Sequence, residues 1–181
     1  LSNKNSENVD ILIWPETAVP FFLEYKKNFR NIMMENVSKP IILGARRYNK
    51  ATNELFNSAY FLDENGKIEQ IYDKKHLVPF GEYIPFIEGL RGIIGFFDLP
   101  MSNVSHGSPL QENIRILDNI PISSPICFDI AFPNTVRKMN KSSLLMINVS
   151  NDTWFGNSIG PYHHLSIARV RSIAVSYTHL R

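Results

Sequence analysis

The fold is decided by one stretch, Phe56-Asn57-Ser58-Ala59-Tyr60-Phe61-Leu62-Asp63-Glu64-Asn65-Gly66-Lys67-Ile68-Glu69-Gln70-Ile71-Tyr72. It contains two strand-like apolar runs joined by the turn-forming residues 63–66, a pattern typical of a β-hairpin. A third such run, Ile41–Tyr48, lies just before it. We therefore predict three strands here, of which the last two pair as a hairpin and form part of a sheet.

The rest of the chain alternates strand and helix patterns around this sheet. A strand is predicted at Val9–Trp14, and a helix at Phe22–Val37 that ends before Pro40. Pro79–Pro85 is too rich in Pro and Gly for regular structure. The later elements are a hairpin of Ile114–Leu117 with Ile120–Ile126, a helix at Asn134–Met139, a strand at Leu144–Val149 and a helix at His164–Val175. This order predicts a layered α/β sandwich.

Composition limits the classes of protein to consider. The chain has 181 residues, of which 44% are hydrophobic, enough for the core of one domain. It contains no apolar run near the roughly 20 residues of a membrane helix, and its first residues lack the apolar region of a signal peptide. The net charge of +2 argues against nucleic acid as a partner. The single cysteine excludes an internal disulfide.

Three chemically useful side chains follow strand-like runs: Glu16, Lys74 and Cys127. A thiol can attack an acyl carbon, a carboxylate can take its proton, and an ammonium can stabilise the resulting oxyanion. Taken singly, each has a simpler explanation. Cys127 would be an inert core residue, Glu16 an acid at a helix start, and Lys74 a solvated charge.

Other kinds of site have little support in the sequence. The five histidines (His76, His106, His163, His164 and His179) show no metal-ligand spacing. There is no Gly-rich phosphate loop and no serine nucleophile motif. We expect neither a metal nor a cofactor.

Longer motifs favour the catalytic interpretation. Trp14-Pro15-Glu16-Thr17-Ala18, the segment from Asp73-Lys74-Lys75-His76 to Phe80-Gly81-Glu82-Tyr83-Ile84-Pro85, and Ile126-Cys127-Phe128-Asp129 resemble the nitrilase (carbon-nitrogen hydrolase) superfamily. Within it, residues 97–102, 151–156, 158–161 and 168–171 resemble the apolipoprotein N-acyltransferase branch. The resemblance runs from Val9 to Val175 and implies an αββα sandwich of the nitrilase type.

The resemblance implies an acyl transfer through a cysteine thioester, without a cofactor. A phospholipid would donate its acyl chain to Cys127, and the N-terminal amine of a diacylglyceryl-cysteine apolipoprotein would accept it. Glu16 would be the general base, and Lys74 would stabilise the oxyanion and lower the pKa of Cys127. Lys75 is the alternative cation, but the family motif matches Lys74. Backbone N–H groups just after Cys127 would add oxyanion donors.

Further residues support this set or depart from it. Glu82 matches a functional Glu of the family and is expected to orient Lys74. Phe128 and Asp129 stand where the family usually has Tyr and Glu; we expect the resulting changes in hydrogen bonding to leave activity intact. Phe96, Phe97 and Trp154 are predicted to give the lipid access, the two phenylalanines on a flap facing the membrane. A core position for these two phenylalanines is an even alternative.

The family also sets expectations for the domain and its location. Residues 1–175 are predicted to be a partial catalytic domain, truncated at both ends, and residues 176–181 a non-native tail. The family's N-terminal membrane helices would place the enzyme in the bacterial inner membrane, with this domain on the periplasmic side. Two alternatives remain: a soluble nitrilase-like amidase with water as acceptor, and a catalytically dead binding domain of the same fold.

Overall fold

The computed structural model describes residues 8–79, 81–83, 104–175 and 179–180. Its first sheet has the order β1-β2-β3-β4, formed by Leu12–Ile13, Ile41–Asn49, Glu54–Leu62 and Ile68–Asp73. Strand β1 runs parallel to β2, while β2, β3 and β4 are antiparallel neighbours. The predicted β3–β4 hairpin is confirmed, with Ala59 opposite Tyr72 and an irregularity in the register at Phe61/Leu62.

The second sheet has the order β5-β6-β7-β8, formed by Ile114–Ile116, Ile120–Ser123, Leu145–Ile147 and His179–Leu180. Strands β5 and β6 form the second predicted hairpin, and β7 and β8 add to it in parallel. Helices α2 (Lys27–Val37), α3 (Pro133–Asn140) and α4 (Gly160–Ala174) complete the regular structure, together with the short 3₁₀ helices η2 (Leu23–Tyr25), η4 (Cys127–Ala131) and η5 (Asp152–Phe155).

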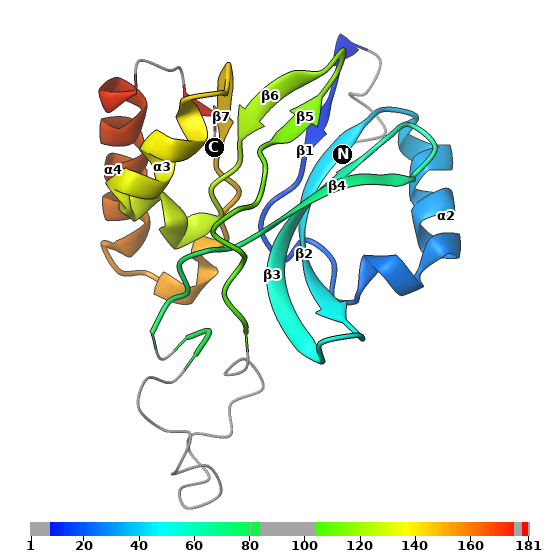
Figure 1. The fold of residues 1–181 in the computed structure, drawn as a ribbon, viewed down its shortest axis with the longest axis horizontal. Helices are drawn as coiled ribbons and strands as arrows, with labels where there is room; N and C mark the ends of the chain where they lie inside the picture. Colours follow the sequence, from blue (N-terminus) through cyan, green and yellow to red (C-terminus); the bar gives the residue numbers. More distant parts are fainter. Residues whose placement is uncertain (1–7, 80, 84–103, 176–178, 181) are drawn as a thin grey trace, which may run out of the picture.

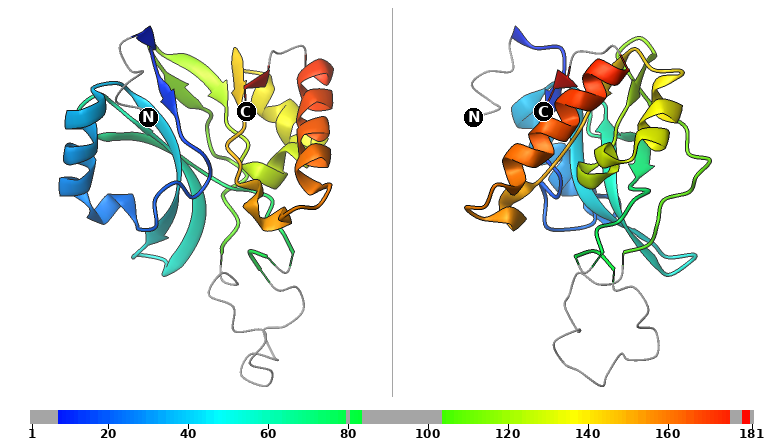
Figure 2. Two further views of the ribbon diagram at one scale, coloured as in Figure 1. Left: turned by 180° about the vertical axis from the view of Figure 1, so that it is seen from behind. Right: turned by 90° about the vertical axis from the view of Figure 1, so that its left-hand side faces the viewer.

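The elements form four layers, helix–sheet–sheet–helix. In Figure 1, α2 covers the outer face of the first sheet, and α3 and α4 cover the second. The two views of Figure 2 show the same arrangement from behind and from the side. One buried cluster, including Ile42, Tyr72 and Ile122, fills the space between the sheets. A second cluster, including Met34 and Leu43, lies under α2. The predicted αββα sandwich is confirmed.

Several boundaries differ from the predictions. Helix α2 begins at Lys27 rather than Phe22, because η2 precedes it and Lys26 leaves helical geometry at φ −120° and ψ 51°. Helix α4 begins four residues early, at Gly160, with Pro161 in its first turn. Strand β6 ends at Ser123, just before Ser124-Pro125, where proline lacks the N–H for a ladder. No helix in the described part of the chain is long and apolar enough to cross a membrane.

Candidate active site

A cavity of about 240 Å³ opens beside the residues that follow β1, β4 and β6. Both sheets contribute to it, so residues far apart in the sequence meet there. Its polar lining includes Glu16, Arg46, Asn57, Lys74, Glu82 and Cys127. Its apolar lining includes Val78, Val104, Trp154 and Phe155. The cavity therefore combines a charged group of side chains with an apolar wall.

Glu16 is buried, 5% exposed, in the turn after β1. Its Oε1 accepts a hydrogen bond from Asn57 Nδ2 at 2.7 Å, and its Oε2 accepts one from the backbone N–H of Asn151 at 2.9 Å. Gly44 permits this turn to lie against β2, because a Cβ on Gly44 would be 2.5 Å from the Glu16 Cα. The backbone of Thr17, at φ 53°, completes the turn. The carboxylate is thus held from both sheets.

Lys74 directly follows β4 and is 1% exposed. Its Nζ lies 2.8 Å from Glu82 Oε2 and 3.4 Å from Glu16 Oε1. Burial opposes the charge on this ammonium, but Glu16 and Glu82 outweigh burial and raise the pKa of Lys74 above its ordinary value. The lysine is therefore a fixed cation between two carboxylates.

Asn57 joins the two carboxylates from the middle of β3. Its Nδ2 donates to Glu82 Oε1 at 2.6 Å as well as to Glu16, and its backbone carbonyl accepts from the N–H of Lys74 at 2.8 Å. Glu82 Oε2 also accepts from the N–H of Val78 at 2.9 Å. Glu82 thus contacts both Lys74 and Asn57, and Asn57 links it to Glu16.

Cys127 begins η4 with a left-handed backbone, φ 45°, which a non-glycine residue adopts only under constraint. Its N–H donates to the Val149 carbonyl at 2.8 Å. Its thiol and the Glu16 carboxylate both line the cavity, and the charge of Glu16 acts on the thiol. The nucleophile candidate, which follows β6 of the second sheet, thus meets the carboxylate that follows β1 of the first.

Lys74 lowers the pKa of Cys127, as expected, but the net shift is opposite to the predicted one. Burial, and next the charge of Glu16, raise the pKa of the thiol to about 12, and Lys74 offsets only part of this. Burial and the nearby carboxylates together outweigh the charge of the lysine. Cys127 is therefore a thiol at neutral pH, and nucleophilic attack by its sulfur would require a base.

Asp129 is fully buried and ties the Lys74 segment to the Cys127 segment. Its carboxylate accepts from the N–H of His76 at 2.7 Å, from the N–H groups of Lys75 and Ile126 at 3.4 and 3.3 Å, and from the Tyr72 hydroxyl at 3.2 Å. Burial raises its pKa to about 6, although the backbone N–H groups act in the opposite direction. Asp129 thereby fixes the backbone on both sides of the site.

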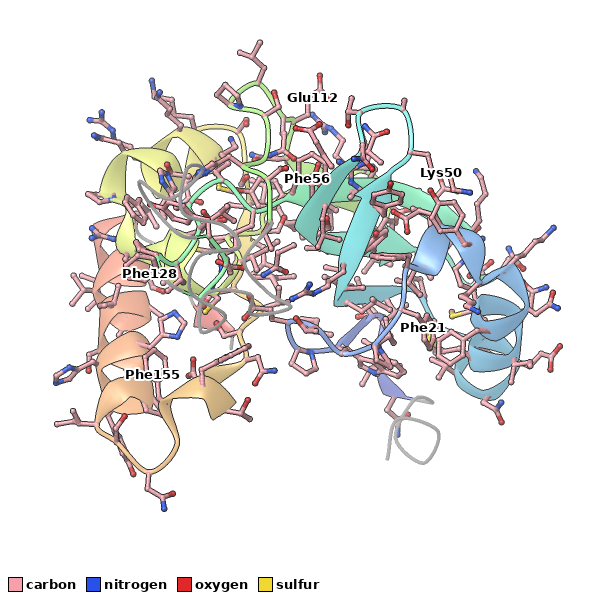
Figure 3. All side chains as sticks on the ribbon, turned by 90° about the horizontal axis from the view of Figure 1, so that it is seen from below. Phe21, Lys50, Phe56, Glu112, Phe128 and Phe155 are labelled. Carbon is pink, nitrogen blue, oxygen red and sulfur yellow. The ribbon has the colours of Figure 1, made fainter. Side chains whose placement is uncertain are left out.

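The other residues singled out from the sequence lie around this centre. Phe128 is 37% exposed and packs edge-on against Phe132, and Trp154 is 66% exposed at the cavity. Figure 3 shows Phe128 and Phe155 on the side of α3 and α4, with Phe56 on the side of the first sheet. Lys75, the alternative cation, is absent from the lining of this cavity, and its Nζ lies 3.5 Å from the Pro109 carbonyl oxygen.

The expectations for the flap and for the tail concern residues that the structure mostly does not describe. The flap residues Phe96 and Phe97 lie outside the described residues, and so does most of the tail 176–181. Both expectations stay predictions.

A second chain of polar contacts lies behind Cys127. His164, 6% exposed on α4, has Nδ1 2.7 Å from Asp152 Oδ1 and Nε2 3.1 Å from the Cys127 carbonyl oxygen. Ligand-type atoms of Cys127, Asp152 and His164 lie within 4.8 Å of one another, although sequence spacing gave no sign of it. Both ring nitrogens of His164 are used in these contacts, so the arrangement is first of all a hydrogen-bond chain.

Five residues of the site were not predicted from the sequence: Asn57, Asn151, Asp152, His164 and Asn148, whose Nδ2 lies 3.4 Å from the Cys127 carbonyl oxygen. Asn57 carried a signal, because it is polar in the middle of an apolar strand. Asn151 and Asp152 lie in a motif that was quoted without giving them roles. His164 was dismissed together with His163 for lack of spacing, since a periodicity argument does not reveal a partner on another element.

Comparison with known proteins agrees with this fold. The sequence model of the family described as carbon-nitrogen hydrolase matches residues 2–177. The apolipoprotein N-acyltransferase of Azotobacter vinelandii is 35% identical over 96% of this chain, and that of Rhodopseudomonas palustris is 38% identical over 92%. The chain spans 34% and 32% of these two proteins, about a third of each.

Among solved structures, the C. elegans NitFhit protein matches 99% of this chain and 44% of its own, with a TM-score of 0.70 at 18% identity. At this identity, the match concerns the fold alone.

Proposed function

Because the chain belongs to the carbon-nitrogen hydrolase family, and its curated relatives are apolipoprotein N-acyltransferases, we propose that it carries out acyl transfer through a thioester on Cys127. The observation that supports this most directly is the meeting of Cys127 and Glu16 in one cavity, with Lys74 Nζ 3.4 Å from Oε1 of the same carboxylate. The apolar cavity wall suits an acyl chain. The acyl donor is a membrane phospholipid, and the acceptor is the N-terminal amine of a diacylglyceryl-cysteine apolipoprotein.

The first half-reaction moves the acyl chain onto the protein. Glu16 takes the thiol proton as the sulfur of Cys127 bonds to the ester carbonyl carbon, and the carbonyl electron pair moves to oxygen. The Lys74 ammonium, with the N–H of Phe128, stabilises this oxyanion. Collapse breaks the ester bond, and the lysophospholipid alkoxide leaves with the proton from Glu16. A thiol with a raised pKa is suited to this step, since proton transfer and attack are coupled.

The second half-reaction uses the same groups. The apolipoprotein amine attacks the thioester carbon, Glu16 takes its proton, and the tetrahedral intermediate again faces Lys74. The C–S bond breaks to give an amide, and the sulfur recovers the proton from Glu16. In the alternative amidase reaction, water would replace the amine with the same residues in the same roles.

We also propose where the complete enzyme lies and how the lipid reaches the cavity. The complete enzyme is placed in the bacterial inner membrane, with this partial domain, residues 1–175, on the periplasmic side. Trp154, exposed and lining the cavity, is a contact for the incoming acyl chain.

Detection of the acyl thioester on Cys127 tests this proposal. Incubating the complete protein with phospholipid alone should add an acyl group to Cys127, visible by mass spectrometry and removed by neutral hydroxylamine. Adding a diacylglyceryl-cysteine peptide should then transfer the group to its amine. Cys127→Ser should form no such adduct. An active protein without a labile adduct would overturn the mechanism, and release of free fatty acid in place of peptide acylation would favour the amidase.

A further inference from the structure

The Cys127 carbonyl is held by two donors from the second half of the domain. His164 Nε2 lies 3.1 Å from this oxygen, and Asn148 Nδ2 lies 3.4 Å from it and 2.9 Å from the Pro125 carbonyl. A carbonyl oxygen only accepts hydrogen bonds, so Nε2 carries the hydrogen. The imidazole is in turn fixed by Asp152, 2.7 Å from Nδ1.

These contacts control one peptide group. The carbonyl of Cys127 and the N–H of Phe128 belong to the same planar unit and point in opposite directions. A donor that fixes the carbonyl on the α4 side therefore aims the Phe128 N–H away from α4. Hydrogen bonding to the carbonyl also polarises the unit and strengthens its N–H as a donor.

We infer that His164, held by Asp152, is a positioning residue for the oxyanion site, acting through the Cys127–Phe128 peptide. The ring is not the base for the thiol, because its Nε2 contacts the carbonyl oxygen and its Nδ1 contacts Asp152, which leaves neither nitrogen to take the thiol proton. The structure thus assigns two polar groups of side chains to two tasks. Glu16 and Lys74 handle the proton and the charge, and Asp152 with His164 orients the backbone donor.

This inference rests on the proposed chemistry only in requiring a tetrahedral oxyanion on Cys127, so it can be tested without phospholipid. A p-nitrophenyl ester acylates a cysteine through the same intermediate. Glu16 takes the thiol proton as sulfur bonds to the carbonyl carbon, and the carbonyl electron pair moves to oxygen; its return breaks the ester bond and expels p-nitrophenolate. Alkylation by iodoacetamide displaces iodide at a saturated carbon and needs no oxyanion donor. The ratio of the acylation rate to the alkylation rate therefore measures the contribution of the oxyanion donor. The alkylation rate alone measures the reactivity of the thiol.

In the complete protein, His164→Leu should slow acylation of Cys127 by p-nitrophenyl butyrate about 10- to 100-fold, in the range for loss of an oxyanion donor. Alkylation, followed on the Cys127 peptide by mass spectrometry, should change less than about threefold. His164→Gln keeps an N–H donor and should recover part of the acylation rate. Asp152→Asn, which weakens the hold on the ring, should slow acylation less than His164→Leu does. His163→Leu is the matched control, since this neighbouring side chain is exposed, and should match wild type.

An equal loss of acylation and alkylation in His164→Gln and Asp152→Asn would overturn the inference, because the pair would then hold the thiol or the fold. Unchanged acylation in both would overturn it as well. These two conservative variants decide the matter if His164→Leu does not fold. If the wild-type protein reacts with the ester but not with phospholipid, the proposed function fails while this test stands.

Discussion

The two sheets supply the two halves of the site in different ways. On the first sheet, Glu16, Lys74 and Glu82 are held mainly by one another and by Asn57, through side-chain contacts of 2.6 to 3.4 Å. On the second sheet, Cys127 is held mainly by its backbone, through Val149 and His164. The charged half depends on electrostatic balance, and the thiol half depends on backbone geometry.

This difference has consequences for mutation. Removing one charge from the first half leaves a buried partner uncompensated, which affects stability and activity together. Removing a support from the second half changes the direction of a peptide group and affects activity more than stability. Substitutions in each half can therefore distinguish the two kinds of support.

Lys74→Met should have the largest effect, because Glu16 and Glu82 would remain buried without their cation. We expect a loss of about 3–5 kcal/mol in the free energy of unfolding, together with loss of acyl transfer. Chemical denaturation and the thioester assay measure the two. Adding Glu82→Gln to Lys74→Met should restore part of the stability and none of the activity. A Lys74→Met protein as stable as wild type would show that the charges are not coupled.

Gly44→Ala should disturb the first half through its backbone. The new Cβ would lie 2.5 Å from the Glu16 Cα and 2.8 Å from the Pro15 oxygen, so the turn that carries Glu16 must shift. We expect destabilisation of about 1–3 kcal/mol and up to about a 100-fold loss of acylation rate. Gly81→Ala, with its nearest atom 3.5 Å away, should leave the stability within about 0.5 kcal/mol. Equal stability changes in the two variants would contradict this explanation.

Trp154→Ser should have the smallest effect on the fold, because 66% of this residue is exposed. Loss of an apolar contact at the cavity should raise KM for a bilayer phospholipid about tenfold, with the thermal midpoint nearly unchanged. Tyr162→Ser is the matched control, an aromatic residue 72% exposed on α4 and absent from the cavity lining. Equal changes in KM for the two variants would place lipid entry elsewhere.

The sequence predicted the framework of the site better than its supports. Apolar runs located the strands, and strand ends located Glu16, Lys74 and Cys127, since a side chain just beyond a strand lies at a fixed edge of the sheet. Helix starts were less predictable: α2 and α4 begin where Lys26 and Pro161 alter the backbone, which apolar periodicity does not report.

The pKa of Cys127 was predicted with the wrong sign for a physical reason. The sequence showed that a lysine belonged to the site, but not that two carboxylates would compensate it or that the thiol would be buried. His164 and Asp152 were missed because their contacts join η4, η5 and α4, whose approach is a result of tertiary packing.

The central claim is that Glu16 is the charge that both raises the pKa of Cys127 and accepts its proton. The direct measurement is the pH dependence of Cys127 alkylation by iodoacetamide in the complete wild-type protein and in Glu16→Gln. The wild-type rate should rise with pH through 10 without a plateau, since the thiol pKa is about 12. In Glu16→Gln, Lys74 acts on the thiol with one carboxylate fewer opposing it, so the midpoint should fall by about one pH unit or more. Acyl transfer should be lost even though more thiolate is present. Glu82→Gln should shift the midpoint in the same direction but less. A Glu16→Gln midpoint that is unchanged or higher, or acyl transfer that survives in this variant, would contradict the account.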